Sequence, residues 1–142
     1  MKTVKILAVL LCGATALLCA GCATTGQGPA DDELIAQMVE RWKAALIAQD
    51  AAGTMACFSE NFTHYEVKDK ATMTDMLGQA FDMGMGEDMD IDLKDAKTVV
   101  ESEKATVGPI HLSTIAGSLS GDLVLAKENG QWLITTIDAS GY

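Results

Sequence analysis

Residues 41–50 read Arg-Trp-Lys-Ala-Ala-Leu-Ile-Ala-Gln-Asp and form the second half of a stretch with helical periodicity. Three acidic residues open this stretch, Asp31, Asp32 and Glu33. Acidic side chains stabilise the first turn of a helix because they face the positive end of its dipole. Apolar residues then recur at helical spacing, at Leu34, Ile35, Met38, Trp42, Ala45 and Leu46. The sequence therefore predicts one long amphipathic helix that ends at Gln49-Asp50.

A short helix and a short strand are predicted to follow. Met55 and Phe58 can share one face of a helix over residues 51–58. Residues 59–61 (Ser-Glu-Asn) are typical of a turn, and residues 62–67 (FTHYEV) are typical of a strand.

A third helix is predicted over residues 71–83. Thr72 would cap its start, and Gly84 and Gly86 would end it. Its apolar face comprises Met73, Met76, Leu77, Ala80 and Phe81.

Everything beyond residue 88 is predicted to be β-structure. Met89, Ile91 and Leu93 alternate with polar residues, as in a strand with one apolar face. Asn129-Gly130 is a typical hairpin turn. Residues 98–101 continue this strand or begin another, and further strands are expected over residues 104–115 (with an irregularity at Gly108-Pro109), 118–127 and 131–139. Helices followed by strands predict an α+β domain.

The stretch at residues 41–50, the aromatic-acid turn at residues 58–62 (FSENF) and the closing GQWLI at residues 130–134 resemble the nuclear transport factor 2-like superfamily. This superfamily includes SnoaL-like cyclases and ketosteroid isomerases. The resemblance implies one domain over residues 31–142, in which N-terminal helices pack on a strongly bent antiparallel sheet and leave a cone-shaped pocket. The side chains expected to line that pocket are Trp42, Phe58, Phe62, Met73, Leu77, Phe81 and His111.

The resemblance also allows a test for catalytic residues. Glu66 matches the position of the base that removes a proton in ketosteroid isomerases, but Trp42 stands in place of the tyrosine that stabilises the oxyanion. The later strand offers His111 and no acidic residue between Lys104 and Leu119. The chain is therefore not expected to be a ketosteroid isomerase. Glu66 with His64 or His111 remains the candidate set for another acid–base enzyme, because histidine titrates near neutral pH.

The N-terminus predicts a lipoprotein. Lys2 and Lys5 precede an uncharged apolar run of residues 6–18, which is too short to span a membrane as a helix. Residues 18–22 (LCAGC) resemble the cleavage site of lipoprotein signal peptidase. We therefore expect a signal peptide over residues 1–21, lipid on Cys22, a flexible tether over residues 22–30 and a bilayer as partner. Ala23 after the lipidated cysteine resembles the pattern for delivery to the periplasmic face of an outer membrane.

Composition and spacing exclude several functions. The net charge of −10 argues against nucleic acid as a partner. After the predicted cleavage and lipidation only Cys57 remains as a free thiol, which favours a small core residue over a nucleophile. The acidic run at residues 88–92 has Leu93 and Val99 where a calcium loop needs Gly and Glu. Methionines near residue 83 are typical of a pliable core rather than a copper site, so no metal and no cofactor is expected.

Two functional hypotheses follow from the sequence. In the first, an envelope lipoprotein without a catalytic set binds a small apolar ligand or a protein partner in the cone, or pairs through its sheet face with a second copy or another envelope protein. In the second, the pocket houses an isomerase, cyclase or hydratase that uses Glu66 and a histidine.

Overall fold

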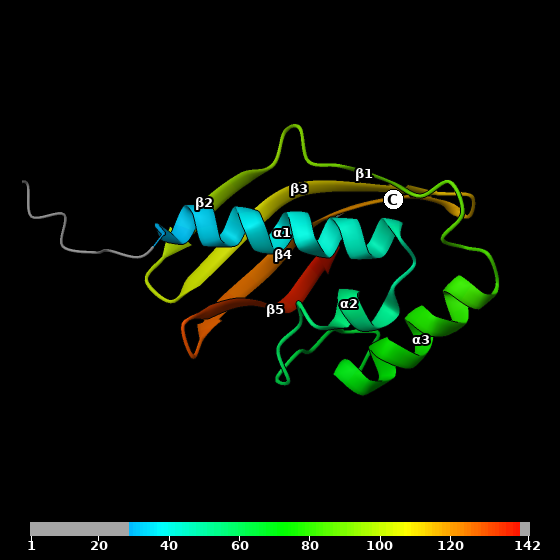
Figure 1. The fold of residues 1–142 in the computed structure, drawn as a ribbon, viewed down its shortest axis with the longest axis horizontal. Helices are drawn as coiled ribbons and strands as arrows, with labels where there is room; N and C mark the ends of the chain where they lie inside the picture. The colour runs from blue at the N-terminus through cyan, green and yellow to red at the C-terminus, as the bar shows by residue number, and fades with distance from the viewer. Residues whose placement is uncertain (1–28, 140–142) are drawn as a thin grey trace, which may run out of the picture.

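Helix α1 (Asp31–Ile47) lies along one face of an antiparallel sheet in the computed structural model, which describes residues 29–139 (Figure 1). Helices α2 (Ala51–Met55) and α3 (Lys70–Asp82) follow it and lie at one end of the molecule. The strands are β1 (Asp90–Asp92), β2 (Lys97–Glu101), β3 (Lys104–Thr114), β4 (Gly117–Glu128) and β5 (Gln131–Ala139). The predicted α+β class is confirmed.

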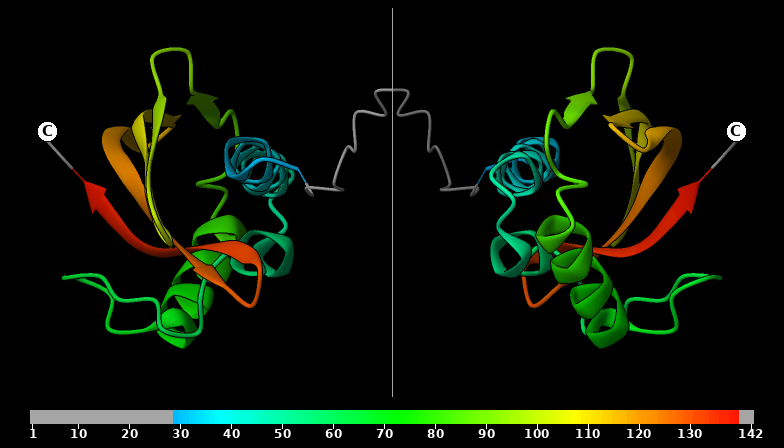
Figure 2. Two further views of the ribbon diagram at one scale, coloured as in Figure 1. Left: turned by 90° about the vertical axis from the view of Figure 1, so that its left-hand side faces the viewer. Right: turned by 90° about the vertical axis from the view of Figure 1, so that its right-hand side faces the viewer.

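The sheet has the order β1-β3-β4-β5, and β2 pairs with the first half of β3 while β1 pairs with its second half. Strands β4 and β5 curve strongly around the helices (Figure 2). Asn129 and Gly130 both have positive φ, at 50° and 79°, and connect β4 to β5 as the predicted hairpin turn. Such turns match the twist of the paired strands.

The core lies between α1 and the sheet. The helix buries Ile35, Met38, Val39, Trp42 and Leu46, a stripe that departs from the predicted apolar face mainly by including Val39. Facing them are buried sheet residues, among them Val107, Ile110, Leu123, Leu125 and Ile134. Each fully buried side chain of this kind contributes about 1.5–3 kcal/mol relative to exposure, so this stripe fixes α1 on the sheet.

Two register shifts change which side chains face the core. One lies in β3 between Val107 and Ile110, where the irregularity was predicted, and one lies opposite Val124 and Leu125 in the β4–β5 pair. Ala105 and Val107 point inward before the first shift, whereas Ile110 and Leu112 do so after it. An extra residue in a strand moves the inward position from odd to even numbers because side chains alternate between faces.

The predicted strand at residues 62–67 is wrong. Phe58 instead forms an isolated bridge with Ile134, which also ends α2 before the predicted residue 58. Thr63 donates its backbone N–H to Thr135, and the chain then turns, with His64 donating to Val67. Residues 57–63 therefore run beside β5 without forming a strand.

The cap of α3 also differs from the prediction. Asp69, not Thr72, is the capping residue: its carboxylate accepts hydrogen bonds from the backbone N–H and the hydroxyl of Thr72, both at 2.8 Å. These bonds lower the pKa of the Asp69 carboxyl. The helix ends at Asp82, and the predicted stop residue Gly84 follows two residues later with a φ of 78°.

No helix within residues 29–139 is long and apolar enough to cross a membrane. The predicted signal peptide, the lipid site at Cys22 and most of the tether lie outside the described residues.

Candidate functional site

A pocket of about 350 Å³ opens at the end of the sheet, beside α3. Its walls come from residues 64–67, from α3, from the start of β4 and from the end of β5. The apolar side chains that line it are Val67, Met73, Met76, Leu119, Ile137 and Ala139, and the polar ones are His64, Tyr65, Glu66 and Ser118. A mostly apolar hollow with a few polar groups at one side is the usual composition of a ligand site.

The second register shift brings Ile137 into this pocket. Trp132 and Ile134 face the core in the first half of β5, whereas Ile137 pairs with buried Leu123 after the shift. Leu119 faces the same side because it pairs with Leu112, which packs against the core. Leu119 is 46 % exposed and Met76 is 50 % exposed, so the pocket presents apolar surface to solvent.

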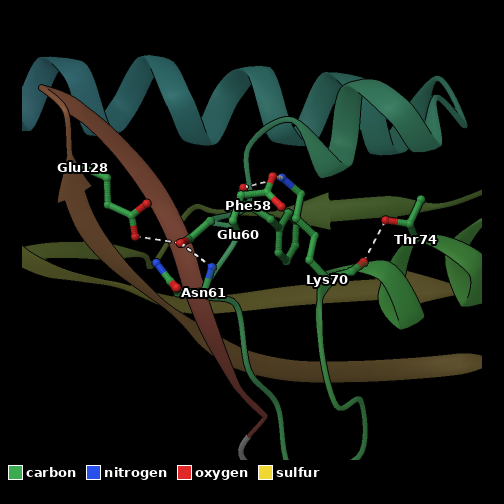
Figure 3. A network of polar contacts seen from close by, with 7 residues as sticks. Phe58, Glu60, Asn61, Lys70, Thr74 and Glu128 are labelled. Carbon is green, nitrogen blue, oxygen red and sulfur yellow. Dashed lines mark hydrogen bonds and ion pairs between the residues drawn. The ribbon is translucent and has the colours of Figure 1, made fainter.

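A polar network holds residues 58–61, which precede the wall formed by residues 64–67 (Figure 3). Ser59 donates from its buried hydroxyl to Glu128 at 2.6 Å and accepts from the N–H of Asn61 at 2.9 Å. Lys70 donates to the Phe58 carbonyl at 2.9 Å and pairs with Glu60, which joins the turn to the start of α3. Phe58 also contacts Phe62 edge-on, with ring centroids 5.0 Å apart.

His64 and Glu66 lie together in the pocket wall, as their spacing suggested. The contact between them is a bond from the Glu66 backbone N–H to Nδ1 of His64, at 3.2 Å. With Nδ1 accepting, the neutral imidazole carries its hydrogen on Nε2. The Glu66 side chain is exposed, and its carboxylate forms no ion pair with a described residue.

His111 does not line the pocket. It is exposed on β3, where it pairs with Asp92 and Ser120 and follows buried Ile110. The register shift before Ile110 places it on the face of the sheet away from α1. The structure therefore separates His111 from the candidate pair His64 and Glu66.

The other expected pocket residues divide into two groups. Met73 lines the pocket, and Leu77 and Phe81 are partly buried against the core. Trp42, Phe58 and Phe62 are at most 5 % exposed within the core, so the space that the sequence assigned to a pocket is largely filled by side chains. Among residues 29–139 there is no group of three or more His, Cys, Asp or Glu side chains that could hold a metal ion.

Solved structures with the same arrangement share little sequence with this chain. An NTF-2-like protein of unknown function from Shewanella oneidensis MR-1 superposes with a TM-score of 0.61 at 16 % identity, over 78 % of this chain and 98 % of that one. A protein of unknown function with a cystatin-like fold from Nostoc punctiforme PCC 73102 gives 0.61 at 16 % identity, over 78 % and 91 %. The fold is nuclear transport factor 2-like.

A putative calcium/calmodulin-dependent protein kinase II association domain from Xanthomonas campestris has this fold as well, with a TM-score of 0.59 at 13 % identity over 83 % of this chain and 91 % of that one. No protein-family model matches the chain, and a search of curated proteins finds no match. At these identities the likeness establishes the nuclear transport factor 2-like fold alone, and function has to be argued from the pocket.

Sequence reasoning missed seven pocket residues of this nuclear transport factor 2-like domain: Tyr65, Val67, Met76, Ser118, Leu119, Ile137 and Ala139. Met76 was on the predicted apolar face of the third helix, and the run of residues 112–119 carries no charge, so both contained a signal. Ile137 had none, because its direction depends on a register shift that residue alternation does not reveal.

Proposed function

We propose that this chain is a membrane-anchored binding protein, held by lipid on Cys22, whose pocket receives an apolar group of its ligand. The apolar lining of the 350 Å³ pocket carries this proposal. Exposed apolar surface costs free energy in water, at about 25 cal/mol per Å², so an occupant that covers Met76 and Leu119 is stabilised. The volume suits a small molecule or one large side chain.

The enzymatic alternative, an isomerase, cyclase or hydratase, has less support. A general acid–base pair needs both groups within reach of one substrate atom. Here Glu66 contacts His64 through its backbone, and His111 lies on the other face of the sheet. We expect Glu66→Gln to leave the occupancy of the pocket by a neutral apolar ligand unchanged.

The binding function is tested with Nile red, a neutral dye that fluoresces in apolar surroundings. The mature chain carrying Cys22→Ala should bind the dye, and Met76→Gln should weaken binding several-fold because the amide must be desolvated at a cost of about 0.5–2 kcal/mol. Met83→Gln is the matched control, because Met83 is 68 % exposed and does not line the pocket. Equal effects of the two substitutions, or no dye binding, would contradict the proposal.

A further inference from the structure

Strand β5 has one free edge beside the pocket. It is the last strand of the sheet, and only β4 pairs with it as a strand. Residues 57–63 cover the first half of its other edge: Ile134 donates to the Cys57 carbonyl and accepts from Ser59, both at 2.9 Å, and Thr135 accepts from Thr63 at 3.0 Å. Beyond Thr135 no described backbone outside β4 bonds to β5.

The pocket begins where this cover ends. The chain leaves β5 at His64, which donates to Val67 at 3.2 Å and so turns away from the strand. Residues 64–67 then form one wall of the pocket, while Ile137 and Ala139 form the other. A chain that continued along the path of residues 57–63 would therefore run beside Thr136–Ala139, next to the pocket-lining residues Ile137 and Ala139.

One acidic residue, Glu66, is the only charged residue that lines the pocket. Its side chain is exposed. Lys68, the nearest base to Glu66 in sequence, does not line the pocket. This charge favours a cationic occupant and disfavours an anionic bilayer or a second copy of a chain whose net charge is −10.

We infer that the pocket and the free edge together bind an extended peptide segment of a partner protein. The segment pairs its backbone with Thr136–Ala139, inserts one apolar side chain between Met76, Leu119 and Ile137, and places a flanking Lys or Arg near Glu66. Strand addition supplies affinity through main-chain hydrogen bonds, and the pocket supplies specificity through alternate side chains. This inference rests on the proposed function, since it assigns the apolar group to a peptide.

The test begins with a library of random decapeptides displayed on phage and selected on the mature chain carrying Cys22→Ala. We expect enriched sequences with alternating apolar residues next to Lys or Arg. A synthetic peptide from this set should lose at least about tenfold in affinity with Leu119→Asp, a difference of about 1.4 kcal/mol. Ile115→Asp is the matched control, because Ile115 is on the same hairpin, 64 % exposed and outside the pocket.

N-methylation of the peptide tests strand addition directly. Alternate backbone N–H groups of an added strand face β5, so methyl groups on one parity should abolish binding and those on the other should leave it intact. Amide hydrogen exchange at Thr136–Ala139 should slow when the peptide binds. Equal sensitivity of both parities would overturn strand addition.

Three further results would also overturn the inference, and none of them would change the outcome of the Nile red test. They are the absence of any enriched peptide, equal losses for Leu119→Asp and Ile115→Asp, and protection of Thr136–Ala139 by self-association without peptide. Dye binding that depends on Met76 would in each case keep the pocket as an apolar binding site and exclude only the peptide.

Discussion

Trp42 is a core residue at the position where the resemblance implied a catalytic tyrosine. The resemblance placed it where ketosteroid isomerases have a tyrosine, and it is 5 % exposed in the core. Its Nε1 is buried and has no hydrogen-bond partner among the described residues. A buried N–H without a partner costs about 1–3 kcal/mol. This cost reduces the stability that the fold gains from burying the ring.

Two substitutions separate the ring from the N–H. Trp42→Ala should lower the free energy of unfolding by about 3–5 kcal/mol, because it leaves a large cavity. Trp42→Phe should lower the free energy of unfolding far less. It leaves a smaller cavity, and removing the unpaired N–H offsets much of the cost of that cavity. Urea denaturation followed by circular dichroism measures both. If Phe were as costly as Ala, the indole N–H would have a partner in solution; a change within about 0.5 kcal/mol for Ala would place Trp42 outside the core.

The histidines show what could be predicted residue by residue. His64 and Glu66 are close in sequence, and the structure keeps them together in the pocket wall. His111 was judged from the parity of a continuous strand that includes Val107, and the register shift between Val107 and Ile110 reversed that parity. Sequence located the irregularity at Gly108-Pro109 but gave no measure of how many residues it added.

At the scale of elements, helix periodicity and turn chemistry were the reliable signals. The Asn129-Gly130 turn, the bounds of β5 and the inward stripe of α1 follow from local preferences that the tertiary structure does not oppose. The strand predicted over residues 62–67 (FTHYEV) does not form. The chain already pairs with β5 at Phe58, which bridges to Ile134, before it reaches these residues. Long-range pairing of this kind has no signature in a six-residue window.

Helix α1 is joined to the β4–β5 hairpin through one carboxylate. Asp31 accepts hydrogen bonds from Nζ of Lys127 at 2.6 Å and from Nε1 of Trp132 at 3.0 Å. These bonds lower the pKa of the Asp31 carboxyl below its ordinary value. A carboxyl with a lowered folded-state pKa stabilises the fold above the unfolded-state pKa of about 3.9, and this contribution disappears as the pH falls through the folded-state pKa.

We therefore expect Asp31→Asn to lower the Tm at pH 7, and the gap between variant and wild type to close progressively below about pH 4. Differential scanning calorimetry across this pH range measures the gap. Asp32→Asn is the matched control: Asp32 is exposed in the same first turn and shares only the helix-dipole effect, so its substitution should lower the Tm at pH 7 less than Asp31→Asn does. A gap that persisted at low pH would mean that Asp31 acts through packing rather than through its charge.

For the whole molecule, the point where the chain enters the fold and the pocket lie at opposite ends of β4. Asp31 contacts Lys127 near the end of β4, whereas the pocket includes Ser118 and Leu119 at its start. A strand rises about 3.3 Å per residue, so the nine steps from Ser118 to Lys127 span at most about 30 Å along β4. The nine residues from Cys22 to Ala30 also reach at most about 30 Å when fully extended. An anchored domain whose α1 start faces the bilayer would present its pocket toward a partner in the aqueous compartment.

Replacing Cys22, the proposed lipid site, tests this arrangement. Cys22→Ala should abolish incorporation of labelled palmitate in the host and leave either uncut precursor or a soluble, unacylated product, because the acyl chains supply the anchor. Cys57→Ala should still take up the label, since Cys57 is fully buried and has no route to acylation. Nile red binding should be equal in the soluble Cys22→Ala chain and in the wild-type chain reconstituted in nanodiscs, after subtraction of empty nanodiscs, because the pocket faces away from the anchor. Label retained by Cys22→Ala would disprove the lipid site, and dye binding lost only in the anchored chain would instead place the pocket against the membrane.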